Sequence, residues 1–128
     1  MSLHPNRVAA VVDDDDNVRK ATAGLVRSMG WQVLAYSSAV HFLESPDIGR
    51  IDCLIADVRM PVMSGPQLHQ ALIANGHAIP TIFVTAQPSH QLVASLLALD
   101  VLAVLEKPLD ADLLEQVLAN ITGQSAPD

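Results

Sequence analysis

The chain has 128 residues, which suits a single domain, and it carries a net charge of −7 at pH 7. This charge opposes a nucleic-acid-binding face, because such a face must neutralise phosphates with Lys and Arg. With only one cysteine, Cys53, no internal disulfide can form, and a reducing, cytoplasmic location is expected. We expect no membrane span, since no apolar stretch is long enough, and no signal peptide, since residues 1–6 lack an apolar segment.

Strands and helices are predicted to alternate through the first half of the chain. Apolar residues at helical spacing favour a helix at 17–29, which Gly30 ends. The alternating pattern at 31–36 favours a less buried strand. In order, the predicted elements are a strand at 7–12, a helix at 17–29, a strand at 31–36, a short helix capped by Ser37 or Ser38 that ends near Ser45, and a strand that ends at Asp57.

The same alternation continues through the second half. Pro66 suits the first turn of a helix, and Gly76 suits its end. In order, the predicted elements are that helix, a strand at 79–84, a helix at 90–99, a strand that ends near Leu105, and a helix after Asp110 that turns Leu113, Leu114, Val117, Leu118 and Ile121 inward. The first, third and fifth strands are continuously apolar, as strands covered on both faces are. Five successive strand–helix units predict an α/β fold, a doubly wound five-stranded parallel sheet.

Polar residues close four of the apolar runs. In chain order they are Asp13 and Asp14, Asp57, Thr85 and Lys107. In a parallel sheet these positions meet at the carboxyl edge, where open α/β sheets place their sites. A charged group at the end of a buried strand is costly without a partner or a function. The pattern therefore predicts an acidic phosphoryl or metal site at this edge.

The residue types at this edge fit phosphoryl chemistry. Three carboxylates close together repel one another, and a divalent cation compensates them. Mg²⁺ prefers oxygen ligands and takes one or two carboxylates with waters and a phosphate oxygen. Asp57 is a candidate nucleophile, because carboxylates form aspartyl phosphates. Lys107 is expected to supply positive charge, and the Thr85 hydroxyl is expected to donate to a phosphoryl oxygen.

Other polar residues fit ordinary structural roles. Asp15 and Asp16 are expected to form a solvated turn, with one of them capping the helix that follows. An EF-hand reading of the same segment is rejected, because Val18 stands where that loop requires Gly. Four of the five histidines are expected at the surface or at helix caps, since they show no metal-binding spacing; they are His41, His69, His77 and His90.

A phosphatase is the enzymatic alternative. Asp14-x-Asp16 resembles the first motif of haloacid-dehalogenase-type phosphatases, which also use an aspartate nucleophile. Thr85 and Lys107 follow in that family's order. That family usually needs a longer chain and either a cap or a further acidic pair. Multiple turnover of external phosphate esters would distinguish it from a domain that is phosphorylated once.

Four segments carry the motifs of a known family. They are Val11-Val12-Asp13-Asp14-Asp15, Asp57-Val58-Arg59-Met60-Pro61-Val62-Met63-Ser64-Gly65, Val84-Thr85-Ala86 and Glu106-Lys107-Pro108. Together they resemble the receiver domain of two-component response regulators, and the second is most similar to the FixJ-type branch. The resemblance covers residues 7–121, which leaves 1–6 as an N-terminal tail and 122–128 as a C-terminal tail or linker.

The resemblance implies a CheY-like sheet with strand order 2-1-3-4-5 and a signalling domain, not an enzyme. It implies that Asp57 is the phosphoacceptor, that Thr85 is the switch hydroxyl, and that Lys107 contacts the phosphoryl group beside a cis bond to Pro108. The implied ligands of Mg²⁺ are the carboxylates of Asp13, Asp14 and Asp57 and the backbone carbonyl of Arg59. The implied partner is a sensor histidine kinase or a phosphotransfer protein.

The sequence departs from the family at the aromatic residue that usually takes part in signalling. The family has Tyr or Phe shortly before the Lys, and here Val104 stands at that position. The stretch 92–105 is unusually apolar, and a core helix needs only one apolar stripe, so side chains such as Leu97 are expected at a partner surface. In the family this face dimerises, and a homodimer through helix 90–99, strand 101–105 and the last helix is expected. The alternative for these apolar side chains is burial under a neighbouring loop. The alternative for the domain as a whole is a degenerate receiver that acts as a scaffold.

Overall fold

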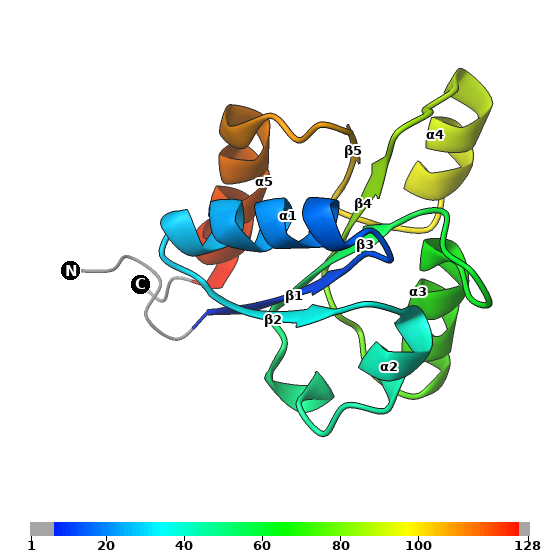
Figure 1. The fold of residues 1–128 in the computed structure, drawn as a ribbon, viewed down its shortest axis with the longest axis horizontal. Coiled ribbons are helices and arrows are strands. Elements are labelled where there is room, and N and C mark those ends of the chain that lie inside the picture. The colour runs from blue at the N-terminus through cyan, green and yellow to red at the C-terminus, as the bar shows by residue number, and fades with distance from the viewer. Residues whose placement is uncertain (1–6, 126–128) are drawn as a thin grey trace.

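A sheet of five parallel strands forms the centre of the fold in the computed structural model, which describes residues 7–125 (Figure 1). The strands are β1 (Val8–Val12), β2 (Gln32–Tyr36), β3 (Cys53–Asp57), β4 (Thr81–Thr85) and β5 (Ala103–Glu106). They lie in the order β2-β1-β3-β4-β5, and every neighbouring pair is parallel. This arrangement confirms the predicted doubly wound α/β sheet and its strand order.

Helices cover both faces of this sheet. They are α1 (Asp16–Ser28), α2 (Ala39–Leu43), α3 (Gly65–Ala74), α4 (His90–Leu97) and α5 (Ala111–Ser125), with a 3-10 turn at Ile48–Arg50. In Figure 1, α1 and α5 lie on one side of the sheet, and α2 and α3 lie on the other. The last helix continues past residue 121, where the domain was expected to end; residues 1–6 and 126–128, expected as tails, lie outside the described residues. Within 7–125, none of the helices has the length and hydropathy needed to cross a membrane.

Local sequence signals set where the helices begin. Asp15, not Asp16, caps α1, because its carboxylate accepts hydrogen bonds from the backbone N–H groups of Asn17 and Val18. Ser38 caps α2 in the same way. At α3 a capping box precedes Pro66, which stands in the first turn as predicted.

Two aliphatic clusters fill the space between the sheet and its helices. The cluster under α1 and α5 contains Ala23, Val26, Ile55, Leu114 and Leu118 among its buried members. The cluster under α2, α3 and α4 contains Phe42, Leu54, Leu68, Phe83 and Leu96. The central strands β1, β3 and β4 are buried along their whole length. Burial on both faces holds the carboxyl ends of these strands in fixed positions, and the site is built there.

Three expectations about burial were wrong. The fifth strand is only half-buried, because it lies at the edge of the sheet and pairs with β4 alone. Leu113 is 49% exposed, since the stripe of α5 that faces the sheet runs through Leu114 and Leu118. His69 is 6% exposed, on the buried side of α3 against Phe83, and its Nε2 is hydrogen-bonded to the Leu99 carbonyl (3.1 Å).

Candidate functional site: an acidic pocket at the carboxyl edge of the sheet

Backbone hydrogen bonds bring the polar strand ends to one place. The N–H of Asp13, directly after β1, donates to the Tyr36 carbonyl at the end of β2 (3.2 Å). The N–H of Lys107, directly after β5, donates to the Thr85 carbonyl at the end of β4 (2.9 Å). Asp57 is the last residue of β3, between these two strand pairs. The predicted convergence at the carboxyl edge is therefore present in the structure.

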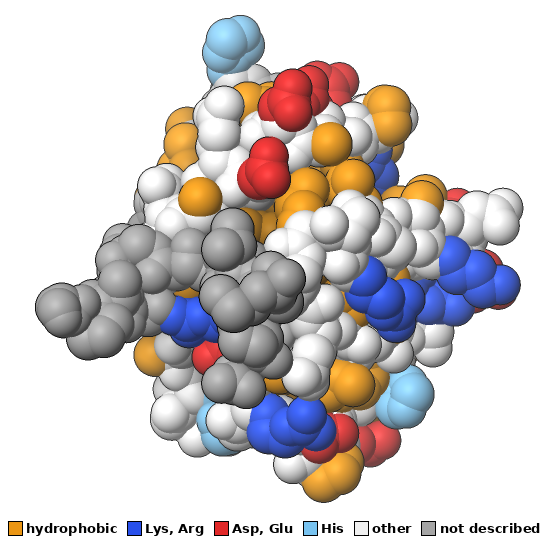
Figure 2. All heavy atoms as spheres, turned by 90° about the vertical axis from the view of Figure 1, so that its left-hand side faces the viewer, with side chains coloured by type: hydrophobic (Ala, Val, Ile, Leu, Met, Phe, Trp, Pro, Cys, Tyr) orange, Lys and Arg blue, Asp and Glu red, His pale blue; other side chains and the backbone are white. Residues whose placement is uncertain are grey.

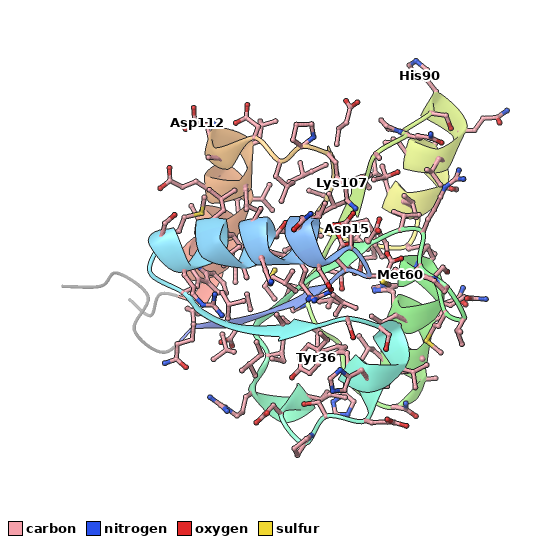
Figure 3. The ribbon with its side chains drawn as sticks, viewed as in Figure 1. Asp15, Tyr36, Met60, His90, Lys107 and Asp112 are labelled. Atoms are coloured by element: carbon pink, nitrogen blue, oxygen red, sulfur yellow. The ribbon has the colours of Figure 1, made fainter. Side chains whose placement is uncertain are left out.

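Lys107 joins two of the three acidic residues. Its Nζ lies 3.0 Å from Oδ2 of Asp13 and 3.1 Å from Oδ2 of Asp57. Both aspartates are buried, at 4% and 8% exposure. In Figure 3, Lys107 extends toward the loop before α1, where Asp15 is labelled, in agreement with these contacts. The peptide bond between Lys107 and Pro108 is cis, as the family resemblance implied.

The charges of the site alter the proton affinities of its members. Burial raises the pKa of the Asp57 carboxyl above its usual 3.8, the nearby Asp13 charge adds to the rise, and Lys107 and the Arg59 N–H oppose it. Burial lowers the pKa of Lys107, but its contacts with Asp13 and Asp57 outweigh that effect and hold this pKa above its usual value. Asp57 is thus an unusually basic carboxylate beside a firmly protonated lysine.

The donor set fits a hard divalent cation. One carboxylate oxygen from each of Asp13, Asp14 and Asp57 lies within 4.8 Å of the others. Three carboxylates and the single ammonium of Lys107 leave two negative charges, which a divalent cation would balance. Asp14 is exposed, so the cluster is open to solvent on one side. All-oxygen ligation with room for waters is the environment that Mg²⁺ prefers.

Thr85 and Arg59, the two remaining residues of the predicted site, also lie at the carboxyl edge of the sheet. Thr85 is buried at the end of β4, and its hydroxyl accepts a hydrogen bond from the Gln87 N–H (3.2 Å), which leaves the hydroxyl's own proton free to donate. The backbone N–H of Arg59 donates to the Asp57 carboxylate. The roles of the Arg59 carbonyl as a cation ligand and of Thr85 as a phosphoryl partner stay predictions.

The loop after Asp57 is packed tightly against the site. The N–H of Gly65 donates to the Val58 carbonyl, and the N–H of Val58 donates to the Val84 carbonyl, both at 3.0 Å. A side chain at Gly65 would overlap the Asp57 carbonyl and press on the Phe83 ring. The motif therefore needs glycine here because the start of α3 passes directly over the end of β3.

Comparison with known families agrees with this geometry. A family model described as the response regulator receiver domain matches residues 9–119. The chain belongs to this receiver domain family. The resemblance found in the sequence is therefore confirmed, and the domain has a signalling role in two-component systems.

Known receiver domains and response regulators resemble this one over most of its length. FixJ of Azorhizobium caulinodans, a transcriptional regulatory protein, is 37% identical over 117 residues, which cover 91% of this chain and 55% of FixJ. The response regulator TmoT of Ectopseudomonas mendocina is 46% identical over 80 residues, which cover 61% of this chain and 36% of TmoT. A receiver domain from Clostridium thermocellum is 22% identical with a TM-score of 0.84 over 92% of this chain and 95% of that one, which shows the shared fold. The response regulator StyR is 34% identical with a TM-score of 0.76, over 93% of this chain and 58% of StyR.

TmoT, FixJ and StyR are longer than this chain. The receiver domain covers 36% of TmoT and 55% of FixJ, so it spans about half the length of these relatives or less. The activity of such a whole protein therefore does not follow from the role of its receiver domain.

One residue near the site was missed by sequence reasoning. Arg19, on the first turns of α1, donates from Nη1 to the Asp13 carbonyl (2.9 Å) and from Nη2 to the Asp16 carboxylate. The spacing of three residues between Asp16 and Arg19 was the available signal, since such pairs meet on a helix.

Proposed function

We propose that Asp57 accepts a phosphoryl group from the phosphohistidine of a sensor kinase or phosphotransfer protein, in a reaction that requires Mg²⁺. The observation that carries this proposal is the placement of the Asp57 carboxylate between Lys107 and two further aspartates. A carboxylate oxygen of Asp57 forms a bond to phosphorus, the bond from phosphorus to the histidine nitrogen breaks, and the imidazole leaves with that electron pair. The negative charge of the phosphoryl oxygens is the main obstacle in such a transfer.

Each residue of the site has a defined part in this proposal. Asp13, Asp14 and Asp57, with the Arg59 carbonyl, would hold Mg²⁺, which when bound neutralises phosphoryl oxygens. Lys107, which contacts Asp13 and Asp57, would donate to a further phosphoryl oxygen. The Thr85 hydroxyl turns its free proton toward the phosphoryl group. These parts make Asp57 a self-catalysed acceptor and not an enzyme that turns over external substrates.

A cavity beside Lys107 leaves room for part of the phosphodonor protein. An apolar cavity of about 350 Å³ lies between α1 and the segment after β5, and Val18, Leu25, Lys107 and Pro108 are among its lining residues. A partner that seats an apolar side chain there is held directly beside Lys107. We also propose a cytoplasmic location, because a single buried thiol such as Cys53 stays reduced there.

The output surface in this proposal is the face formed by α4, β5 and α5. Leu97 on α4 is 50% exposed and Leu113 on α5 is 49% exposed, and β5 between these helices is the half-buried edge strand. Phosphorylation is proposed to promote association of two copies through this face. Because Val104 replaces the usual aromatic residue, the signal would travel through Thr85 and backbone shifts of β4 and β5.

The domain alone is not proposed to bind DNA. Its net charge is −7, and it has seven Lys and Arg residues. On the face drawn in Figure 2, Lys and Arg side chains lie in separate small groups and form no continuous basic surface. Phosphate backbones need several such charges together.

Stoichiometric labelling tests the proposed function. With a small acyl phosphate donor, the wild type should take up one phosphoryl group per chain with Mg²⁺ and none with EDTA. Asp57→Asn should take up none, and hydroxylamine should release the label from the wild type, as it does from acyl phosphates. Repeated turnover of an external phosphate ester by the wild type would instead favour the phosphatase, and no labelling at all would favour a scaffold.

A further inference from the structure

Arg19 ties α1 to the loop that carries the acidic pair. Its Nη1 donates to the backbone carbonyl of Asp13 at 2.9 Å, and its Nη2 donates to the carboxylate of Asp16. The Arg19 side chain is largely covered, with an exposure of 16%. One arm of the guanidinium thus contacts the loop after β1 and the other contacts the first residue of α1, and this two-armed contact fixes the geometry more than an ordinary surface ion pair does.

Asp13 itself is held from several directions. Its N–H donates to the Tyr36 carbonyl, its Oδ1 accepts from the Asp15 N–H (2.9 Å), and its Oδ2 contacts Lys107. The hydrogen bond from Arg19 to its carbonyl completes this set. Asp13 is 4% exposed, so a carbonyl that lost the Arg19 hydrogen bond would be poorly compensated by water.

The carbonyl of Asp13 matters because it belongs to the same planar peptide unit as the N–H of Asp14. Fixing that carbonyl fixes the plane from which the Asp14 Cα and side chain project. Asp14 is exposed, whereas Asp13 and Asp57 are buried. Of the three clustered carboxylates, Asp14 therefore depends most on its backbone for its position.

We propose that Arg19 is a positioning residue for the divalent cation, acting through the Asp13–Asp14 peptide without touching the cation. This inference rests on the proposed function, because it concerns the same cation site. It predicts that removing a positive charge near the site lowers the affinity for the cation. Arg19 brings a positive charge close to a cation site, so removing that charge would by electrostatics alone tighten cation binding. Loss of positioning would weaken it.

Titration of Mg²⁺ into the purified domain by calorimetry, without any phosphodonor, separates the two effects. Arg19→Met should weaken Mg²⁺ binding about tenfold, the size typical of lost outer-shell partners of metal ligands. Lys20→Met is the matched control, because it removes the same charge from the neighbouring, exposed position of α1. Lys20→Met should leave the dissociation constant unchanged or slightly lowered.

A second variant guards against loss of folding. Arg19→Lys keeps the charge and the long apolar stem, but one ammonium cannot reproduce the two-armed contact with Asp13 and Asp16. It should bind Mg²⁺ more weakly than the wild type while it still unfolds cooperatively in EDTA, which shows that it is folded. Mg²⁺ affinities of Arg19→Met and Arg19→Lys equal to or tighter than that of Lys20→Met would overturn the proposal.

The outcome is independent of the phosphorylation test. If the wild type binds Mg²⁺ but Asp57 takes no label, the proposed function fails while the positioning role of Arg19 can still be measured. If Asp57 is labelled and both Arg19 variants bind Mg²⁺ like the wild type, the positioning role alone fails.

Discussion

Asp14 and Asp15 are neighbours in sequence, but they have different roles in the structure. Asp14 contributes an oxygen to the cluster with Asp13 and Asp57, whereas Asp15 caps α1. Asp14→Ala should weaken Mg²⁺ binding at least about tenfold and leave the free energy of unfolding in EDTA nearly unchanged. Asp15→Ala should do the reverse, with a loss of about 1 kcal/mol of stability. Calorimetric titration and urea unfolding measure the two effects, and equal losses of affinity would indicate a diffuse acidic patch.

The raised pKa of Asp57 predicts how stability depends on pH. A carboxyl whose pKa is higher in the folded than in the unfolded state favours folding when protonated, and this contribution is lost as pH rises through the folded value. At pH 7, well above the ordinary pKa of 3.8, the raised pKa of Asp57 therefore makes the fold less stable than an unshifted carboxyl would.

Asp57→Asn should accordingly stabilise the domain at pH 7 in EDTA by about 1 kcal/mol, a size typical of single stabilising substitutions. The gain should shrink as the pH is lowered through the raised folded pKa, and it should be smallest well below 3.8, where the wild-type carboxyl is protonated in both states. Saturating Mg²⁺ should stabilise the wild type more than the variant. Urea unfolding across this pH range measures the gain, and a gain that grew on acidification would contradict the assigned shift.

At the scale of elements, the β3–α3 corner decides whether Asp57 is held in place. Gly65→Ala should destabilise the domain by about 1–3 kcal/mol, because the added carbon overlaps the Asp57 carbonyl. Gly24→Ala is the control. Gly24 lies exposed within α1 with no atom near the added carbon, so this change should stabilise by up to about 1 kcal/mol. Thermal unfolding of both variants measures the difference, and equal effects would show that the corner is not tightly packed.

The elements that sequence reasoning placed well are those with strong local signals. Continuous apolar runs located β1 and β3, and the polar residues after them located the acidic cluster. The exposure of β5 was not predicted from its own residues, because its apolar run looks like that of a central strand; the strand order implied by the family resemblance already placed it at the edge. The burial of His69 depends on Leu99, thirty residues away, which no local pattern records.

The loop between Asp57 and α3 was also beyond local reasoning. Val62 adopts a left-handed conformation with φ of 71° and is 93% exposed, although a β-branched residue disfavours that region. Hydrogen bonds on both sides of the loop and the packing at Gly65 impose this turn. Gly, Asn or Asp is the usual residue at such a position, so the valine gave no signal of the left-handed turn.

At the scale of the whole molecule, the exposed apolar residues of the α4–β5–α5 face predict association. With Mg²⁺ and beryllofluoride as a phosphoryl mimic, the domain should shift from monomer toward dimer in sedimentation velocity experiments. Leu97→Asp should abolish this shift and leave Asp57 labelling intact, because Leu97 is exposed on α4, away from the acidic cluster.

Ile73→Asp provides the matched control for this face. Ile73 is 56% exposed on α3, so the change introduces the same charge at an equally exposed apolar position outside the proposed interface. It should leave association unchanged. A monomer with and without the mimic, at high protein concentration, would rule out association through this face.

The central claim is that Asp57 is the residue that receives the phosphoryl group. The most direct measurement is to phosphorylate the domain with Mg²⁺, reduce the acyl phosphate with borohydride, and locate the converted aspartate by peptide mass spectrometry. The account predicts conversion of Asp57 to homoserine in the wild type and conversion of no aspartate in EDTA. Conversion at Asp14, the nucleophile of the phosphatase alternative, with Asp57 unchanged would contradict it.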